Sequence, residues 1–421
     1  MIRGYFTTLP LIALHILLAG GTLNAQVATP SYTVDDLVRI ALEKYEPLKA
    51  QEAKVRENAA LGRHLGEWYN PEFSFSAGQK TADGASGREF GASVTQRISF
   101  PGKKGLMEEM ALLEEGRARL SLDEMKLFLR YEVTRLAYEY AHNLQRKGHI
   151  GDRLRRLQLI NAYMQGRIMI SPQKRVERSI IQSRIALLEK EVHRIGTDIR
   201  TAFERLNLLT GMTGDTLPDV KVKWFSAAPA LNETDLSVRA VRAGFPVRAQ
   251  REALKSAARE KALAERNAYP DVGVSVYYND EKVTAQERSI GGGVSFPLPL
   301  FSRNRHAADM GAEKERAEDL HLKHLERSTA VQMKELFARY GYASAMVGNF
   351  RVSGIGELKE AMRYTDAEFR KGRVTLTTYL DMDAQTHEMF EEIYRTQLDL
   401  VNVYTSILFL AADERPVEGD L

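Results

Sequence analysis

Residues 70–76 read Asn-Pro-Glu-Phe-Ser-Phe-Ser, and residues 269–275 read Tyr-Pro-Asp-Val-Gly-Val-Ser. In each stretch, apolar residues alternate with small residues directly after a proline, which is the pattern of a β-strand with one apolar face. A second proline, Pro47 or Pro246, precedes each stretch at the same distance. The two stretches lie 199 residues apart in a chain of 421 residues. The sequence therefore predicts a duplicated structural unit that is about half of the chain long.

Glycine positions support the duplication farther along the chain. Gly91-Ala-Ser-Val94 corresponds to Gly291-Gly-Gly-Val294, and a Gly-Arg pair followed by Ile or Val occurs at Gly166 and again at Gly372. Chance similarity between helices rich in Ala, Glu, Lys and Arg is the alternative, but prolines and glycines matched at matched spacings favour a true repeat. We assign repeat one to residues 32–215 and repeat two to residues 234–412.

Each repeat is expected to contain a helix, two strands and two long helices. The first helix is predicted from Tyr32 to about Trp68, and the strands are predicted at residues 72–79, 91–100, 271–279 and 291–300. Strands of about 8–11 residues have the length that a tilted membrane strand needs. The alternation fits a sheet with one face in lipid and one face in water, and it also fits amphipathic hairpins on a soluble core. The strands alone do not decide between these two interpretations.

The helical segments are unusually long. The sequence contains no proline from Lys103 to Gly166, and apolar residues of the return stretch from Ile181 to Leu206 follow each other at spacings of mostly four and three. This is a seam of the coiled-coil type. A helix of about 60 residues extends on the order of 90 Å and needs neighbours along its whole length. Gly148 and Gly354 lie inside the pattern and indicate either a kink or a close helix crossing.

The composition of the chain excludes several classes of function. Charged residues make up 27% of the chain with a net charge of +3, and basic residues are interleaved with acidic ones, so nothing points to nucleic acid as a partner. The chain has no cysteine, which excludes disulfides, thiolate metal sites and a cysteine nucleophile.

The beginning of the chain predicts a signal peptide at residues 1–25. Arg3 precedes a short apolar run from Leu9 to Ala19, and cleavage after Ala25 leaves a mature chain of residues 26–421. A retained anchor is the alternative. No later stretch approaches 18 uninterrupted apolar residues. A membrane crossing by the mature chain would therefore require a β-barrel, because only helices and closed barrels satisfy all backbone polar groups in lipid.

Four strands are too few to close a membrane barrel, since the smallest such barrels have about eight. A single chain would leave open sheet edges in lipid. A cyclic oligomer solves this problem: three copies supply twelve strands, although two copies would close as well.

Four segments resemble the TolC-like family of outer-membrane efflux proteins. Residues 96–104, Gln-Arg-Ile-Ser-Phe-Pro-Gly-Lys-Lys, and residues 293–304, Gly-Val-Ser-Phe-Pro-Leu-Pro-Leu-Phe-Ser-Arg-Asn, resemble the exits of barrel strands. Residues 166–172, Gly-Arg-Ile-Met-Ile-Ser-Pro, resemble the tip of the first helical hairpin, and residues 369–385 resemble the tip of the second. The Pro-Leu-Pro-Leu-Phe and Pro-Gly-Lys-Lys forms are similar to the heavy-metal efflux branch, the CzcC/CusC-like proteins. The resemblance covers essentially all of the mature chain.

The resemblance implies a mainly α-helical protomer with a small β part. The protomer would form a homotrimer with a twelve-stranded β-barrel in the outer membrane of a Gram-negative bacterium, continued by an α-helical barrel in the periplasm. Its implied function is the passive exit duct of a tripartite efflux pump that exports heavy-metal cations. The implied partners are a periplasmic adaptor (membrane fusion protein), an inner-membrane transporter of the resistance-nodulation-division type and outer-membrane lipid. Drug efflux or type I protein secretion is the alternative within this class, and a secreted coiled-coil scaffold is the alternative outside it.

The hairpin tips are predicted to form the periplasmic gate. Asp381 matches the family's pore-constricting aspartate, and three copies would make an acidic ring that attracts cations; the plainer interpretation is a solvated carboxylate on a helix surface. Gly372 permits a sharp turn, and Thr375 or Thr378 can cap the returning helix. The remaining predicted tip residues are Arg373, Val374, Gly166 and Ser171.

Two departures from the family pattern concern these tips. Val374 stands where the family often has a basic residue, with Arg373 beside it, which puts a salt bridge of the closed state in doubt. Pro172 and Arg175 replace carboxylates in the first tip, so a second acidic ring is not expected.

We predict no metal site, no cofactor and no enzymatic activity. Glu318, His321 and His324 would share one helix face, but such spacing alone is a poor guide to a metal site. Methionines such as Met107 and Met164 more often fill helix interfaces than bind copper. The sequence contains no metalloprotease motif, phosphate-binding loop or nucleophile elbow.

Overall fold

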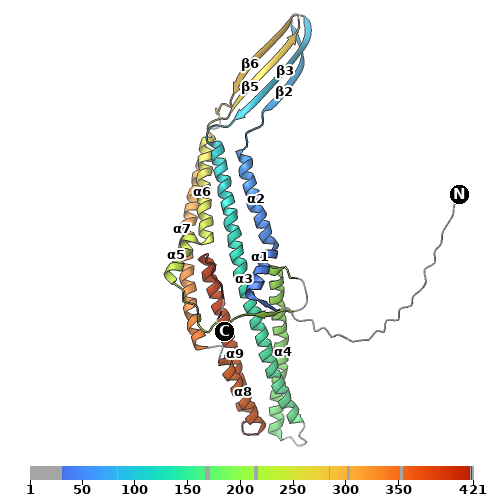
Figure 1. Ribbon diagram of the computed structural model, residues 1–421, viewed down its shortest axis with the longest axis vertical. Coiled ribbons are helices and arrows are strands. Elements are labelled where there is room, and N and C mark those ends of the chain that lie inside the picture. Colours follow the sequence, from blue (N-terminus) through green and yellow to red (C-terminus); the bar gives the residue numbers. More distant parts are fainter. Residues whose placement is uncertain are drawn as a thin grey trace, which may run out of the picture.

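The computed structural model describes residues 31–82, 84–165, 171–212, 217–283, 285–300, 304–350, 354–417 and 419. The predicted signal peptide at residues 1–25 and the tip residue Gly166 lie outside these ranges. The molecule is elongated, with a β-sheet at one end and helices in two successive tiers below it (Figure 1). The predicted fold class, mainly helical with a small β part, is confirmed.

One antiparallel sheet contains four strands in the order β2–β3–β5–β6. The strands are β2 (Glu72–Ala82), β3 (Ala85–Ile98), β5 (Val272–Lys282) and β6 (Gln286–Ser295). The predictions for the second strand of each hairpin, 91–100 and 291–300, were shifted too far along the chain. Pairing continues through the polar, glycine-rich stretches as far as Ala82 opposite Ala85 and Lys282 opposite Gln286. At the other end, Pro297 and Pro299 lack the N–H that a ladder needs, and β6 ends at Ser295.

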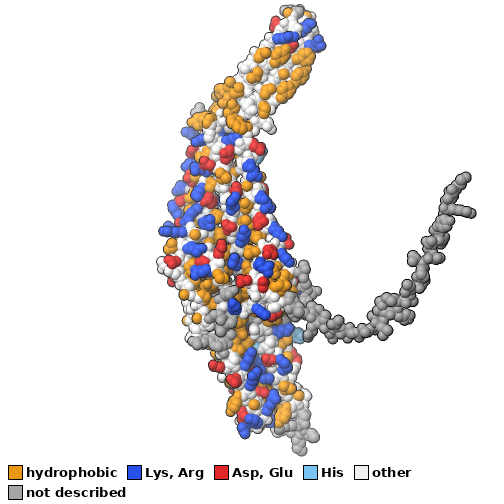
Figure 2. Space-filling model, in the orientation of Figure 1, with side chains coloured by type: hydrophobic (Ala, Val, Ile, Leu, Met, Phe, Trp, Pro, Cys, Tyr) orange, Lys and Arg blue, Asp and Glu red, His pale blue; other side chains and the backbone are white. Residues whose placement is uncertain are grey.

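The sheet has two chemically different faces. Residues directly opposite each other in the register share a face, so Phe73, Val94 and Val276 lie on one side and Ser74, Ser93 and Tyr277 on the other. The first face carries Phe73, Phe75, Ala77, Phe90, Ala92, Val94, Ile98, Val272, Val274, Val276, Tyr278, Ile290 and Val294. Large apolar side chains gather over this part of the molecule (Figure 2), and most of them are exposed.

Prolines divide the helix that precedes each hairpin. In place of the single helix predicted for residues 32–68, the structure has strand β1 (Ser31–Thr33), α1 (Val34–Lys44) and α2 (Glu46–Gly66). Pro47 has no N–H to continue the hydrogen bonding of α1, and it lies in the first turn of α2, where that loss costs nothing. Pro246 divides α5 (Glu233–Ala243) from α6 (Phe245–Arg266) in the same way.

Long helices follow each hairpin. α3 (Lys103–Gln165) and α4 (Pro172–Thr210) follow the first hairpin, and α7 (Arg305–Asn349), α8 (Gly354–Arg370) and α9 (Leu376–Leu410) follow the second. The position of a β-carbon at Gly148, inside α3, has no neighbour within 4 Å, so Gly148 does not mark a close helix crossing. Gly354 instead begins α8. None of the helices in the described ranges is long and apolar enough to cross a membrane.

The helices form two rows that share α3. In the tier below the sheet, α7 packs on α6, α6 on α3 and α3 on α2; in the lower tier, α8 packs on α9, α9 on α3 and α3 on α4 (Figure 1). The two tiers meet at a small parallel ladder between β1 and β4 (Asp219–Lys221). Buried aromatic residues, including Tyr138, Phe225 and Tyr404, fill the core around this level.

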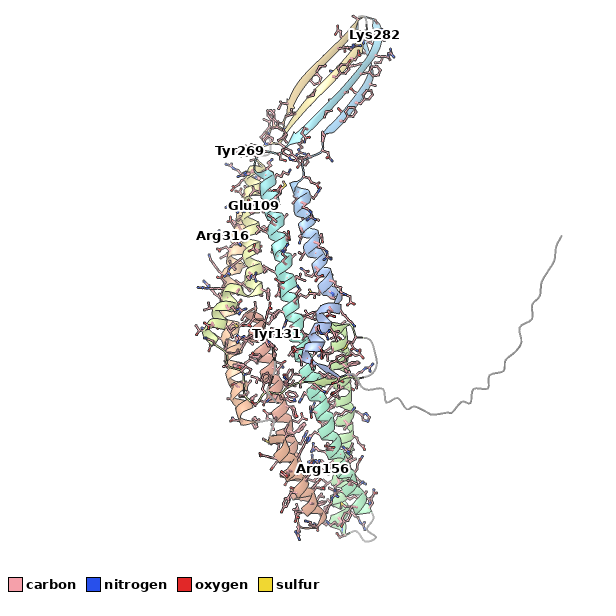
Figure 3. All side chains as sticks on the ribbon, in the orientation of Figure 1. Glu109, Tyr131, Arg156, Tyr269, Lys282 and Arg316 are labelled. Atoms are coloured by element: carbon pink, nitrogen blue, oxygen red, sulfur yellow. The ribbon has the colours of Figure 1, made fainter. Side chains whose placement is uncertain are left out.

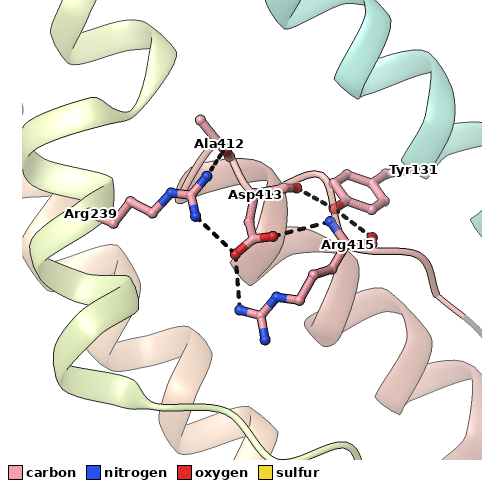
Figure 4. A network of polar contacts seen from close by, with 5 residues as sticks. All are labelled: Tyr131, Arg239, Ala412, Asp413 and Arg415. Carbon is pink, nitrogen blue, oxygen red and sulfur yellow. Dashed lines mark hydrogen bonds and ion pairs between the residues drawn. The ribbon is translucent and has the colours of Figure 1, made fainter.

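Hydrogen bonds and ion pairs join separate segments of the chain at this middle level. The buried Gln397 side chain accepts a hydrogen bond from the Phe225 N–H at 2.9 Å and donates one to the Phe225 carbonyl at 2.8 Å. Beyond α9, Asp413 pairs with Arg239 of α5 at 3.3 Å and with Arg415 at 2.9 Å, and the Tyr131 hydroxyl of α3 donates to the Asp413 carbonyl (Figure 4). These contacts hold the C-terminal segment against both α3 and α5.

Candidate functional site

The tip between α8 and α9 is a tight turn. Gly372 has a φ of 75°, a left-handed conformation that favours glycine. The Thr375 hydroxyl accepts a hydrogen bond from the Thr378 N–H at 3.2 Å and caps α9. At the other tip, the Ser171 hydroxyl accepts from the Lys174 N–H at 3.3 Å and caps α4. Both returning helices therefore begin at defined residues.

Arg373 forms its ion pair within its own hairpin. Its guanidinium lies 3.1 Å from the Glu368 carboxylate, which Lys371 also contacts at 2.6 Å. This pair closes the turn locally and does not join the two hairpins. Val374 packs instead on the apolar core that α3, α4 and α9 share.

A groove of about 620 Å³ lies between the turn that joins α8 to α9 and the described ends of α3 and α4. Gly372, Arg373, Val374 and Thr375, four of the predicted tip residues, lie along one side of it. The other side is formed by α3 and α4 through Leu159, Ile160, Tyr163, Met164, Gln173, Lys174 and Glu177. The structure thus places the turn between α8 and α9 beside the last turns of α3 and the first turns of α4, across a lining of both apolar and polar side chains.

Asp381 does not line this groove. Its side chain is exposed on α9, which is compatible with both a pore-facing carboxylate and an ordinary surface carboxylate. The neighbouring acidic residue, Asp383, points the other way and is only 5% exposed.

Asp383 joins α9 to α3 through a buried ion-pair network that the sequence analysis missed. Its Oδ2 atom accepts hydrogen bonds from Arg153 Nε at 3.0 Å and Nη2 at 2.8 Å, and its Oδ1 atom accepts one from Arg156 Nη2 at 2.9 Å. The Arg153 side chain is 7% exposed. Figure 3 shows Arg156 in the lower tier.

Helical periodicity marks the positions of this network as buried, although it does not identify the partners. Asp383 lies at the spacing of the buried residues Tyr379, Thr386 and Phe390 on α9. Arg153 follows Ile150 and precedes Leu157 on the buried face of α3. Ionisable side chains on the apolar faces of two packed helices require partners of opposite charge. Here the carboxylate of α9 and the guanidinium groups of α3 are those partners for each other.

Electrostatics keeps the carboxylate of this network ionised. Burial raises the pKa of Asp383, but hydrogen bonds and charge from Arg153 and Arg156 outweigh burial and hold this pKa below its usual value of 3.8. The two guanidinium groups thus stabilise a charge that the apolar surroundings alone would disfavour.

Two stacked imidazoles lie next to the network. The rings of His149 on α3 and His387 on α9 are 5.4 Å apart, and His149 also stacks on Phe390 at 4.0 Å. Burial lowers the pKa of His149 to about 3, and the charges of His387 and Arg153 add to this shift. Burial, assisted by Arg153, likewise lowers the pKa of His387. Both rings are therefore neutral at pH 7.

A second polar centre lies where the sheet meets the helices. Asp271, directly before β5, accepts hydrogen bonds from Lys103 Nζ at 2.9 Å, Arg97 Nη2 at 3.0 Å and the Phe100 N–H at 3.0 Å. Lys103 also donates to the Tyr269 carbonyl at 2.7 Å. These contacts tie both hairpins to the top of α3.

Aromatic and basic side chains surround this junction. Tyr269 stacks on Phe100 at 4.7 Å between ring centres, and Figure 3 shows it at the boundary between sheet and helices. The cationic groups of Lys104 and Arg97 lie over the rings of Trp68 and Tyr69, at 4.8 and 5.2 Å. Such combinations are frequent at the edges of membrane-spanning segments.

No metal centre is apparent in the described ranges, because they contain no group of three or more His, Asp or Glu side chains that could hold an ion. His321 and His324 are exposed on α7, and Glu318 accepts a hydrogen bond from Gln250 at 2.6 Å.

No model of a protein family and no curated protein matches the sequence. Solved structures do match. CusC has a TM-score of 0.68 at 14% identity, covering 89% of this chain and 91% of CusC. VceC from Vibrio cholerae has a TM-score of 0.70 at 13% identity, covering 90% and 96%. The open state of the MtrE outer-membrane channel of Neisseria gonorrhoeae has a TM-score of 0.69 at 13% identity, covering 92% and 91%. The chain has the fold of these outer-membrane proteins over nearly its whole length.

Proposed function

We propose that this chain is one protomer of a trimeric duct in the outer membrane of a Gram-negative bacterium, and that it carries out no chemical reaction. The observation that carries the proposal is the four-stranded sheet, which exposes a nearly continuous apolar face and an opposite polar face. A sheet of this kind suits lipid on one side and water on the other. The fold shared with outer-membrane channels supports the same conclusion.

Three copies would complete the barrel. Within the described part of the chain, β2 and β6 each pair along one edge only. Because β2 and β6 lie at opposite ends of the sheet, β6 of one copy can pair with β2 of the next, and three copies supply twelve strands. Like the sheet, each row of described helices has two free ends: α2 and α7 in one tier, and α4 and α8 in the other. Closure would therefore produce a helical tube continuous with the barrel.

The duct would serve a tripartite efflux pump with a periplasmic adaptor and a resistance-nodulation-division transporter. The two hairpin tips would form its periplasmic gate, with Asp381, Gly372, Arg373, Val374, Thr375, Gly166 and Ser171 as the gate residues. We propose heavy-metal cations as the cargo because the Pro-Leu-Pro-Leu-Phe and Pro-Gly-Lys-Lys segments resemble that branch. Deletion of the gene should then sensitise cells to Cu, Ag, Co, Zn or Cd; sensitivity to dyes and detergents instead would indicate drug efflux.

Fractionation and mass determination test the duct itself. The mature protein should be found in the outer-membrane fraction, should have the mass of a trimer in detergent and should conduct ions in a planar bilayer. A monomer in the aqueous fraction would overturn the proposal and would favour a periplasmic scaffold.

Neighbouring residues on opposite faces of β5 provide a matched pair of variants. Val276→Arg places a charge on the apolar face and is expected to destabilise the inserted protein by about 2–4 kcal/mol near the membrane midplane. Ser275→Arg places the same charge on the polar face, where water is expected, and should insert normally. Outer-membrane yield and urea unfolding in lipid measure both effects, and equal losses from the two variants would contradict the assignment of the faces.

A further inference from the structure

The stacked histidines lie inside the contact that joins α9 to α3. His149 Nε2 and His387 Nδ1 are buried and form no hydrogen bond with the described residues. A neutral imidazole can tolerate this environment, but an imidazolium has two N–H donors and a full charge that both require partners. The packing therefore favours the neutral form of both rings.

The surroundings provide little compensation for added positive charge. The charged groups around the two rings come from α3, α4 and α9: Arg146, Arg153, Arg156, Arg184, Glu191, Asp383 and Glu391. The acidic groups among them already have partners. Asp383 pairs with Arg153 and Arg156, and Arg146 lies 2.7 Å from Glu391 and 3.4 Å from Glu191. A proton on either ring would thus enter a region whose carboxylates already have basic partners, and at His387 the effect of burial on the pKa outweighs the opposing charges of Glu391, Glu191 and Asp383.

We propose that His149 and His387 make the contact between α3 and α9 sensitive to acid, so that acidification of the periplasm favours separation of the two helices and opening of the tip. The helix contact is a property of the protomer, whereas its consequence for conduction rests on the proposed duct. The part that would move is the hairpin of α8 and α9. Within the lower tier, α8 contacts mainly α9, so the hairpin is held to α3 through α9. Movement of this hairpin away from α3 would expose both rings to water.

The direction in which pH changes the stability of the contact between α3 and α9 follows from proton linkage. Burial depresses the pKa of both rings below the ordinary value of 6.5, so the separated state binds protons more readily than the packed state. The packed contact therefore has its full stability above pH 6.5 and weakens progressively as the pH falls below this value. For one ring that stays neutral when packed, the equilibrium constant for separation rises about tenfold between pH 7.5 and pH 5.5. His149 alone therefore accounts for about this tenfold change, and the lowered pKa of His387 shifts the equilibrium in the same direction.

Spin-label distances and conductance test the two parts of this inference separately. The chain has no cysteine, so Lys147→Cys on α3 and Glu388→Cys on α9, both exposed positions, can be labelled specifically and diluted into unlabelled protein. We expect a second, longer distance to become populated at pH 5.5. In the same pH range, single channels in a planar bilayer should spend more time in their high-conductance state.

Substitution of the two histidines tests whether they cause the pH dependence of the distance between α3 and α9. His149→Gln together with His387→Gln should reduce the pH dependence of the distance distribution at least tenfold, and His321→Gln, at an exposed histidine on α7, should leave it unchanged. Thermal unfolding at pH 7.5 checks that the double variant is folded, and His387→Gln alone provides a milder substitute if it is not. A pH response that persists in the folded double variant would overturn the inference. If the distances respond but no channel forms, the acid-sensitive contact stands and the proposed duct fails.

Discussion

Asp383→Ala is expected to lower the free energy of unfolding by about 3–5 kcal/mol, because it leaves the buried Arg153 and the partly exposed Arg156 without their counter-charge. Arg153 is 7% exposed and directs two hydrogen bonds to the Asp383 carboxylate. The loss should be concentrated in the lower tier, where the network joins α9 to α3. Denaturant unfolding measures the total, and hydrogen exchange of α9 amides should show local opening near the tip.

Two further variants determine whether the effect has this origin. Asp381→Ala removes an exposed carboxylate two residues away and should change the unfolding free energy by less than about 0.5 kcal/mol. Replacing the network as a whole, with Asp383→Leu, Arg153→Met and Arg156→Met together, should recover most of the loss, since apolar replacement of a complete buried ion pair is often neutral or stabilising. Equal destabilisation by Asp381→Ala and Asp383→Ala would contradict this account of the network.

The same pair of aspartates shows where the sequence was informative and where it was not. Asp381 was singled out through its match to a family motif, which carries no information about which way the side chain points. Asp383 lies at a buried position of the helical pattern of α9, but its partners are about 230 residues away on α3 and only the structure brings them together. Sequence patterns of period 3.6 mark a buried position, but they do not identify the partner.

The architecture was easier to predict because it depends on local signals. Alternating residues predicted all four strands of the sheet. The strand ends differ from the prediction, since backbone pairing extends through polar residues such as Lys80 and Glu89 that interrupt the alternation. Similarly, the single helix predicted for residues 32–68 is divided into α1 and α2, because Pro47 has no N–H to continue the hydrogen bonding of α1.

Asp271→Ala is expected to be the second variant with a large effect, costing about 3–5 kcal/mol. The Lys103 ammonium, which is 9% exposed, would lose its only carboxylate partner in the described structure, and the Phe100 N–H would lose its acceptor. Asp271→Asn keeps an acceptor oxygen for the Phe100 N–H but removes the charge, so its cost should be intermediate. Thermal unfolding in detergent, followed by circular dichroism, gives the three stabilities.

Asp280→Ala is the matched control at the far end of the same strand, where Asp280 contacts Arg288 at 3.4 Å. Exposed pairs of this kind contribute roughly 0–1 kcal/mol, so this variant should remain close to the wild type. The difference matters for function, because β5 enters the sheet directly after Asp271 and α3 leaves the junction at Lys103. If Asp271 fixes the sheet on the helical tiers, its loss should reduce trimer yield even when helix content is retained. A variant with normal trimer yield and normal stability would show that the strand connections alone hold the two parts in register.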